Sequence, residues 1–155
     1  MTPAIDLLVK QKIPHQVLQY EHDAKAASFG LEASEKLGLA AHLVFKTLVV
    51  QLDTEQLCVA ILPVDKMLSM KHMAKAGGAK KAQMADKAQV ERVTGYVLGG
   101  VSPLGQKKRL LTFIDVSAKS LPAIYVSAGK RGLEIAIAPL DLSGALVAKF
   151  CHICQ

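Results

Sequence analysis

Two apolar, β-branched runs constrain the fold more than any other feature of the chain. The run at residues 44–52 (VFKTLVVQL) is followed by the polar residues 53–56 (DTEQ) and by a second apolar run at residues 57–63 (LCVAILP). β-Branched residues favour strands, and a short polar turn between two such runs is typical of an antiparallel hairpin. The sequence therefore predicts a domain built around a β-sheet.

Capping residues and glycines place helices around this hairpin. Thr2 followed by Pro3 predicts the start of a helix that runs to about Lys12, and Gly38 ends a helix predicted over residues 31–37. Apolar periodicity and turn residues predict the remaining elements. Further helices are expected at residues 67–76, 86–93 and 139–149, and further strands at residues 15–20, 80–84, 111–115, 123–127 and 133–138.

The composition favours helices packed on a sheet over an all-β sandwich. The chain has 155 residues, 51 % of them hydrophobic, with 5 % aromatic residues and no Trp. A chain of this length can bury its own core without a metal or disulfides. No repeat, low-complexity tract or linker divides it, so we expect one mixed α/β domain over residues 1–155.

The net charge and the number of cysteines indicate which binding partners and which cellular compartment to expect for the protein. The N-terminus lacks the basic start and long apolar run of a signal peptide, and no apolar segment is long enough to span a membrane. Three cysteines, an odd number, argue against a secreted disulfide framework, so a cytoplasmic protein is expected. A net charge of +6 makes nucleic acid a reasonable partner but does not establish one.

Lys46 is the first residue whose position raises the question of function. Because side chains alternate along a strand, Lys46 shares an apolar face with Leu48 and Val50. Its ammonium either holds a phosphate or carbonyl oxygen of a ligand, or reaches water while its stem lies over the core. Spacing alone favours the second, structural role.

The glycine-rich loop at residues 99–105 (GGVSPLG) is the second candidate. Gly99 and Gly100 would let the backbone approach a ligand closely and direct amide N–H groups at an oxygen. The loop leads into the basic residues 107–109 (KKR), but it lacks the Gly-Lys-Ser/Thr ending of a nucleotide P-loop. It is either a ligand-binding loop or an exposed turn with a charged edge.

No motif for a protein nucleophile or a metal is present. Ser127 precedes a basic glycine turn, but the five histidines are scattered, so Ser127 is interpreted as a polar contact. Cys151 and Cys154 form half of a zinc motif, and Cys58 lies in an apolar strand. We expect no metal and no cofactor, and we interpret the terminal cysteines as a frayed pair without function.

Several longer stretches resemble a known family. They are the opening MTPAIDLL, residues 20–23 (YEHD), residues 45–50 (FKTLVV) and above all residues 94–110 (TGYVLGGVSPLGQKKRL) and 125–135 (YVSAGKRGLEI). The chain resembles the YbaK/EbsC branch of the bacterial prolyl-tRNA synthetase editing-domain superfamily from its start to about Phe150.

The resemblance implies a fold, an activity and partners. It implies a compact, curved mixed sheet with helices and a pocket for an aminoacyl ester. It also implies deacylation of mischarged tRNA in trans, often beside prolyl-tRNA synthetase. The sequence itself has no helix-turn-helix or other groove-reading motif and no long apolar segment, so a DNA-binding regulator is the weaker alternative, and neither DNA nor a membrane is an expected partner. For the cysteine-specific branch, the substrate's own thiol would attack the ester and leave as a cyclic thioester, so the enzyme would only orient the ester and stabilise the oxyanion.

The resemblance further implies individual roles. Lys46 would contact the terminal phosphate or the ester region of the tRNA, and Gly99 and Gly100 would surround the ester as catalytic backbone groups. The aminoacyl pocket would be formed by Tyr20, Phe29, Gly30, Thr47, Ser102, Pro103, Ser127, Gly129 and Glu134. Contacts to the tRNA backbone would come from Lys107, Lys108, Arg109, Lys130 and Arg131, any of which could instead be a solvated rim.

Two departures from the family pattern affect substrate choice. Ala128 stands where many relatives carry a glycine, and Glu134 stands where the best-known members carry Asp. The first change would narrow the turn beside Ser127. Cysteine is therefore the expected substrate, with alanyl-, seryl- or threonyl-tRNA as alternatives, and a non-catalytic tRNA- or synthetase-binding module as the rival from another class.

Overall fold

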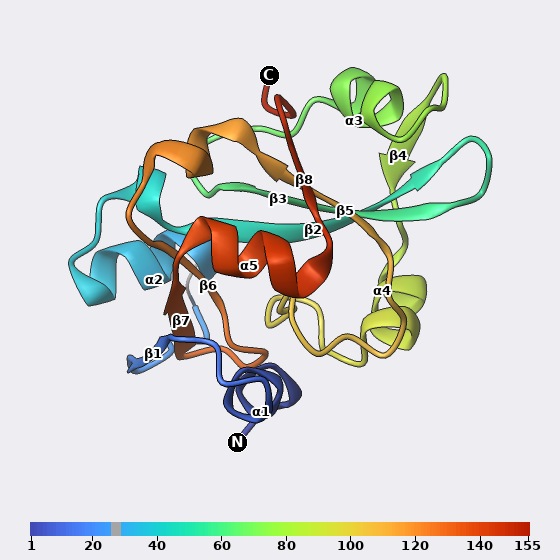
Figure 1. Cartoon of the computed structure of the whole chain (residues 1–155). Helices are drawn as coiled ribbons and strands as arrows, with labels where there is room; N and C mark the ends of the chain where they lie inside the picture. Colours follow the sequence, from blue (N-terminus) through green and yellow to red (C-terminus); the bar gives the residue numbers. More distant parts are fainter. Residues whose placement is uncertain (26–28) are drawn as a thin grey trace.

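The computed structural model describes residues 1–25 and 29–155, without the side chain of Phe29. In this part of the chain the strands form two sheets (Figure 1). The three-stranded sheet has the order β1-β7-β6, with β1 at Gln16–Gln19, β7 at Leu133–Ile137 and β6 at Ile124–Ser127. The five-stranded sheet has the order β4-β2-β3-β5-β8, with β4 at Ala82–Met84, β2 at Phe45–Leu52, β3 at Leu57–Pro63, β5 at Leu111–Asp115 and β8 at Lys149–Cys151.

The predicted hairpin forms the centre of the larger sheet. Strands β2 and β3 pair antiparallel in a register that sets Phe45 opposite Pro63 and Gln51 opposite Leu57. Strand β5 pairs parallel with β3, and β8 pairs parallel with β5, so the sheet is mixed, as expected. The division into two sheets was not predicted, because these pairings join segments that are far apart in the sequence.

The helices begin and end at the residues that the sequence predicts, with small shifts. The Thr2 hydroxyl accepts the Ile5 N–H at the start of α1, and Gly38 follows α2 with a left-handed φ of 67°. Helix α3 starts three residues later than expected, because Ser69 is its N-cap. The bounds are α1 Pro3–Lys10, α2 Phe29–Leu37, α3 Met70–Ala76, α4 Lys87–Thr94 and α5 Pro139–Leu146, with short 3₁₀ turns at Ala41–Leu43 and Val116–Ser120.

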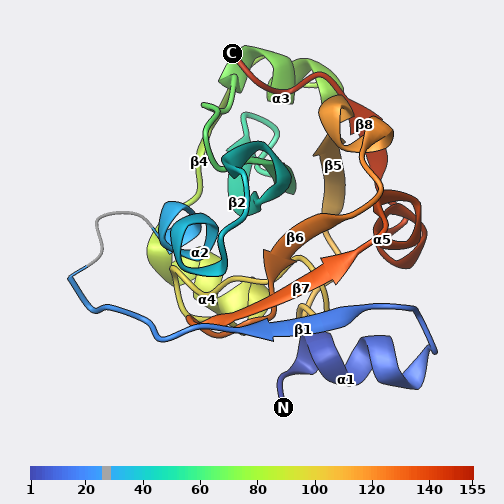
Figure 2. The same cartoon turned by 90° about the vertical axis from the view of Figure 1, so that its left-hand side faces the viewer.

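The helices cover the sheets on several sides. Helices α1 and α2 lie on opposite faces of the three-stranded sheet (Figure 2). Buried side chains of α1 and α5 join those of both sheets in the largest core cluster, whereas α3 and the C-terminal residues cover the other face of the five-stranded sheet. No helix in the described residues is long and apolar enough to cross a membrane.

The C-terminal segment differs most from expectation. The last helix was expected to reach residue 149, but it ends at Leu146, where Val147 takes a left-handed φ of 53° and β8 follows. The expectation of a frayed end is wrong. Ile153 N–H donates to Asp115 Oδ1 at 3.1 Å, and Cys154, only 6 % exposed, pairs with Leu68 in an antiparallel bridge.

Candidate functional site

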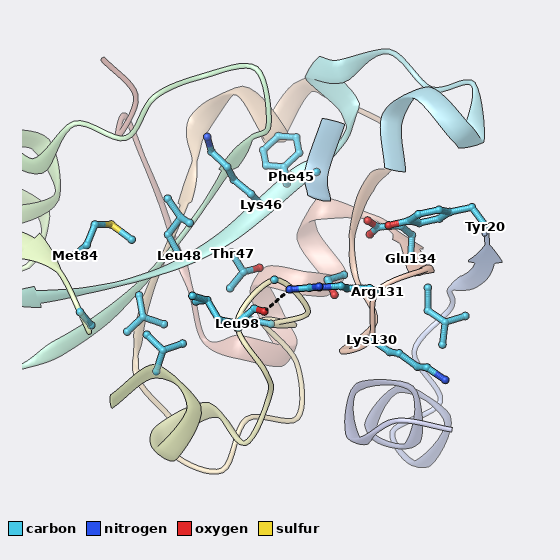
Figure 3. Close-up of a pocket in the computed structure, with 18 residues that line it drawn as sticks. Tyr20, Phe45, Lys46, Thr47, Leu48, Met84, Leu98, Lys130, Arg131 and Glu134 are labelled. Carbon is cyan, nitrogen blue, oxygen red and sulfur yellow. Dashed lines mark hydrogen bonds between the residues drawn. The ribbon is translucent and has the colours of Figure 1, made fainter. Parts of the chain in front are cut away.

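A pocket of about 350 Å³ lies between the two sheets, beside strand β2. Strand β2 contributes one wall, and the segments after β1, before β7 and before Val101 contribute the others (Figure 3). The pocket is lined by Tyr20, Gly30, Phe45, Lys46, Thr47, Leu48, Val49, Met84, Ala85, Val90, Leu98, Gly99, Val101, Ser127, Lys130, Arg131, Leu133 and Glu134.

The pocket lies at a gap in the pairing along one edge of β2. Strand β4 pairs with β2 at residues 50–52, and the Ala85 N–H donates to Val49 O at 3.0 Å, whereas at the other end of the gap Val44 forms an isolated parallel bridge with Tyr125 of β6. The backbone N–H and C=O groups of successive residues point to opposite edges of an antiparallel strand, so those of every second residue point to the same edge. The N–H and C=O groups of Thr47 therefore point to the same edge as those of Val49, toward the pocket.

Lys46 and Thr47 reach the pocket from opposite faces of β2. Figure 3 shows the Lys46 ammonium and the Thr47 hydroxyl directed to different sides of the strand. Burial lowers the pKa of Lys46, while the electrostatic interactions with Cys154 and Asp65 oppose this shift. The ammonium thus lies at the rim near the C-terminal segment, and the hydroxyl lies in the pocket.

Two buried oxygen atoms in the pocket have no hydrogen-bond partner in the described part of the chain. They are Thr47 Oγ1 and Glu134 Oε2. Buried polar groups in native proteins are nearly always hydrogen-bonded, and an exception calls for an explanation. Because both atoms belong to residues of one pocket, a polar ligand is the simplest explanation.

Glu134 is the buried carboxyl group of the site. It lies opposite Ser127 in the β6–β7 pairing and is 6 % exposed. Burial raises the pKa of Glu134 from 4.5 to about 8. Figure 3 shows the Tyr20 ring and the Glu134 carboxyl group directed toward one another. Burial also raises the pKa of Tyr20. This end of the pocket thus carries two groups that are neutral in the empty site near pH 7.

The glycine-rich loop closes the other end of the pocket. Gly99 lines it with a φ of 94°, which strongly favours glycine. The Gly100 N–H instead donates to Val97 O at 2.8 Å, so it is engaged within the loop and does not meet its predicted role as a free amide donor. Arg131 Nη2 donates to Leu98 O at 3.1 Å and ties this loop to the β6–β7 turn.

A second set of polar contacts fixes the segment that carries Tyr20. Glu32 of α2, 4 % exposed, lies with Oε1 2.7 Å from His22 Nδ1, and its Oε2 accepts the Asp23 N–H at 2.7 Å. Lys36 forms an ion pair with the same carboxylate at 3.2 Å. Burial opposes ionisation of Glu32, but these hydrogen bonds outweigh it and lower the pKa to about 2. The clamp joins the β1–α2 connection to α2 next to the pocket.

The structure brings together half of the predicted site residues. Phe29 begins α2, but its side chain lies outside the described residues. The predicted residues that line the pocket are Tyr20, Gly30, Lys46, Thr47, Gly99, Ser127, Lys130, Arg131 and Glu134.

Other predicted residues lie elsewhere. Ser102 is fully buried and accepts the Leu104 N–H, so it stabilises the loop from within and does not line the pocket. Gly129 packs against the Tyr96 ring, and Ala128 is buried in the core. Pro103, Lys108 and Arg109 line a different cavity of about 170 Å³ beside α1 and α5. Lys107 is exposed, with its stem next to Gly95.

Sequence reasoning missed the apolar wall of the pocket. Met84 and Leu98 line it and are 47 % and 45 % exposed. Leu98 stands directly before Gly99 and Gly100, and its position next to this candidate loop could have indicated that it lines the pocket. Met84 follows no motif, because only the short β4 strand brings it to the edge of β2.

The described residues contain no group of three or more His, Cys, Asp and Glu side chains that could hold a metal ion. The pocket lining itself contains neither histidine nor cysteine among the described side chains. A nucleophile for covalent chemistry there would come from the ligand, from water, or from the hydroxyl, amine and carboxyl side chains of the lining, which are those of Tyr20, Lys46, Thr47, Ser127, Lys130 and Glu134.

Several known proteins are similar to this chain in sequence or in fold. The sequence model of the aminoacyl-tRNA editing domain matches residues 24–144. EbsC of Enterococcus faecalis, a candidate Cys-tRNA(Pro)/Cys-tRNA(Cys) deacylase, is 35 % identical over 153 residues, which cover 98 % of this chain and 92 % of the relative. A proline–tRNA ligase of Brachyspira hyodysenteriae is 27 % identical over 90 residues, which are 58 % of this chain and 16 % of that protein. The crystal structure of a candidate trans-editing enzyme for prolyl-tRNA synthetase shares the fold, with a TM-score of 0.87 at 17 % identity over 99 % of this chain and 95 % of that chain.

Proposed function

The chain belongs to the aminoacyl-tRNA editing domain family, and from this membership we propose that it is a trans-editing deacylase that removes mischarged cysteine from tRNA(Pro). Cys-tRNA(Cys) is a second substrate of the same kind. The relative EbsC, whose name refers to both tRNAs, supports this choice, because it matches 98 % of the chain.

One observation carries the proposal: the pocket offers two unpaired buried oxygens and no histidine or cysteine in its described lining. A protein nucleophile of the serine type needs a positioned base, and Ser127 Oγ instead accepts the Gly129 N–H at 3.1 Å. The pocket is therefore suited to bind and orient an ester whose own group performs the attack.

Cysteine supplies such a group. The thiol gives up its proton, and the thiolate sulfur attacks the ester carbonyl carbon, so that a C–S bond forms and the C–O bond to the ribose breaks. The ribose oxygen takes up a proton in place of the one that the thiol lost, and the amino acid leaves as a cyclic thioester. The protein has to hold the thiol near the carbonyl and to stabilise the negative charge on the carbonyl oxygen.

The positions of the residues suggest how this work is divided. Gly99 lines the pocket with its backbone and is our candidate donor to the carbonyl oxygen. Thr47, with an unpaired hydroxyl and an open backbone edge, is placed to contact the ester or a ribose hydroxyl. Lys46 points to the other face of β2, so a phosphate of the terminal nucleotides is a better partner for it than the carbonyl oxygen.

Prolyl-tRNA synthetase is the proposed partner protein. The proline–tRNA ligase of Brachyspira hyodysenteriae contains a segment similar to 58 % of this chain. A separate chain of this family would act on mischarged tRNA that such a synthetase releases.

Release of labelled amino acid from Cys-tRNA(Pro) and Ala-tRNA(Pro) tests the proposal, with the wild type and Lys46→Ala side by side. We expect rapid loss of cysteine only, and a kcat/KM lower by roughly 10- to 100-fold in the variant, as for the loss of one hydrogen bond to a charged phosphate. The thermal unfolding curve of the variant should match that of the wild type.

Other outcomes would change the proposal in defined ways. Loss of alanine instead of cysteine would keep the deacylase and change its substrate. Full activity of Lys46→Ala would remove the role of this residue. Salt-dependent tRNA binding without turnover on any aminoacyl-tRNA would favour the binding module instead.

A further inference from the structure

We infer that the pocket accepts only esters whose amino acid carries a free α-amino group, and that Glu134 is the residue that binds this group. The inference rests on the proposed deacylase function and defines its substrate class more narrowly: aminoacyl-tRNA is cleaved, whereas N-acylated and peptidyl-tRNA are spared.

The first argument is that the Glu134 carboxyl group has no cation in the empty site. Oε2 is buried and has no hydrogen-bond partner among the described residues. Lys46, Lys130 and Arg131 line the same pocket, yet none of them forms an ion pair with Glu134 in the described part of the chain, and burial accounts for its raised pKa without a charged partner. Arg131 Nη2 donates to Leu98 O at 3.1 Å, and Lys46 points to the far side of β2 (Figure 3). A buried carboxylate without a cation is costly, so this site is completed when a ligand brings a positive charge.

The second argument is that every aminoacyl ester brings that charge to the same place. Its ammonium group is attached to the carbon next to the reacting carbonyl, so it enters the pocket together with the ester. Glu134 and the glycine-rich loop line the same cavity of about 350 Å³, and the loop is the proposed contact to the carbonyl. A bond from the ammonium to Glu134 would therefore fix the orientation of the ester.

The third argument is the effect of an N-acyl group. Acylation turns the ammonium into a neutral amide with one N–H and adds bulk at the buried end of the pocket, where Tyr20 and Glu134 meet (Figure 3). Glu134 would stay without a charge partner, and a site built to bind a polar group discriminates strongly against an analogue that cannot pair with it. Acylated substrates should therefore be rejected.

The test compares Cys-tRNA with N-acetyl-Cys-tRNA, both of which retain the thiol. The kcat/KM of each is divided by its spontaneous rate of ester cleavage, which removes the intrinsic effect of acylation. We expect the wild type to prefer the free amine by roughly 10- to 100-fold, the range for a hydrogen bond to a charged group. Glu134→Gln should bring this ratio close to one, mainly by slowing cleavage of Cys-tRNA, and Glu134→Asp should restore part of it.

Thr47→Val is the matched control. It removes the other unpaired oxygen of the pocket with little change in shape, so it should slow both substrates and leave their ratio unchanged. A wild-type ratio near one, or a wild-type ratio retained in Glu134→Gln, would overturn the inference.

A binding measurement separates this inference from the deacylase proposal. The probes are cysteinyl-adenosine with a stable 3′-amide link and its N-acetyl derivative, titrated by calorimetry. We expect the free amine to bind at least tenfold more tightly, and only when Glu134 is present. If no tRNA is deacylated but this preference holds, the inference stands and the proposed activity fails; equal binding of both probes contradicts the inference whatever the activity.

Discussion

At the scale of single residues, strand geometry decides which polar side chains face the pocket together. Lys46 and Thr47 are adjacent in the sequence, yet strand alternation directs them to opposite faces and thus to different parts of a ligand. Glu134 and Ser127 are separated by a turn, yet the β6–β7 register sets them opposite each other.

Glu134 makes stability depend on pH in a direction opposite to that of an ordinary carboxylate. Its pKa is about 8 in the folded state, against 4.5 for an exposed side chain. Between these values the unfolded chain releases a proton that the folded chain keeps, so the free energy of unfolding falls as pH rises. We expect this effect to reach a few kcal/mol, since one pKa unit corresponds to about 1.4 kcal/mol.

Urea unfolding of the wild type and Glu134→Gln at pH 5 to 8 measures the effect. The Gln variant cannot ionise, so its stability relative to the wild type should increase as pH rises. Parallel curves for the two proteins across this range would contradict the raised pKa.

At the scale of elements, the turn between β6 and β7 connects all parts of the site. Its residues 128–132 follow Ser127 and precede Glu134, and Arg131 reaches across to the glycine-rich loop. Gly129 has a φ of 102°, and its Cα lies so close to Tyr96 that an added Cβ would be 2.4 Å from the ring. Tyr96 in turn donates its hydroxyl to Leu104 O at 2.6 Å.

Gly129→Ala should therefore disturb the turn, the ring and the loop together. We expect a loss of about 2 to 4 kcal/mol of stability, from the unfavourable φ and the overlap with Tyr96. Gly144→Ala is the control, since it lies in α5 with nothing within 4 Å of the new Cβ, and should be neutral or slightly stabilising. Thermal unfolding compares the two, and equal melting temperatures would show that the turn tolerates a side chain.

The sequence predicted those elements whose signals are local. Caps such as Thr2 and Asp86, and the apolar alternation of the hairpin, specified most helices and strands to within a few residues. Strand β8 was missed because Val147, a β-branched residue, takes the left-handed conformation that glycine usually marks. The parallel pairing of β5 with β3 and β8 has no local signal, since it depends on packing between distant segments.

The site residues were predicted mainly through family resemblance. Among the predictions that failed are those for residues whose polar groups are bound within the glycine-rich loop and do not face the pocket. Within the glycine-rich block, resemblance could not separate the residue that lines the pocket, Gly99, from Gly100 and Ser102, whose polar groups are used inside the loop. The unpaired Thr47 hydroxyl could not be foreseen either. Whether a strand hydroxyl finds a partner depends on which distant segments pack over its face of the sheet, and the sequence carries no local signal for that packing.

At the scale of the whole molecule, the two basic groups assigned to tRNA are on different sides. Lys130 and Arg131 line the pocket of about 350 Å³, on the side of α2. Lys108 and Arg109 line the second cavity next to α5, and Figure 2 shows α2 and α5 on opposite sides of the molecule. If the ester sits in the pocket as proposed, we expect the acceptor end of the tRNA to contact the first group and not the second. The net charge of +6 attracts the tRNA as a whole and does not choose between them.

Lys130→Ala and Lys108→Ala test this division as a matched pair, because both lysines are exposed and the replacements remove one charge each. A lost phosphate contact lowers the slope of log K against log salt by roughly 0.7 to 0.9, and weakens binding to every tRNA sequence alike. We expect this change for Lys130→Ala and none for Lys108→Ala, measured by filter binding of tRNA at several salt concentrations. Because total charge falls equally in both variants, a general electrostatic attraction would shift the two curves together. Only a local phosphate contact can separate the two curves: a larger effect at Lys130 supports an approach along the pocket, and a larger effect at Lys108 would place the bound tRNA on the α5 side.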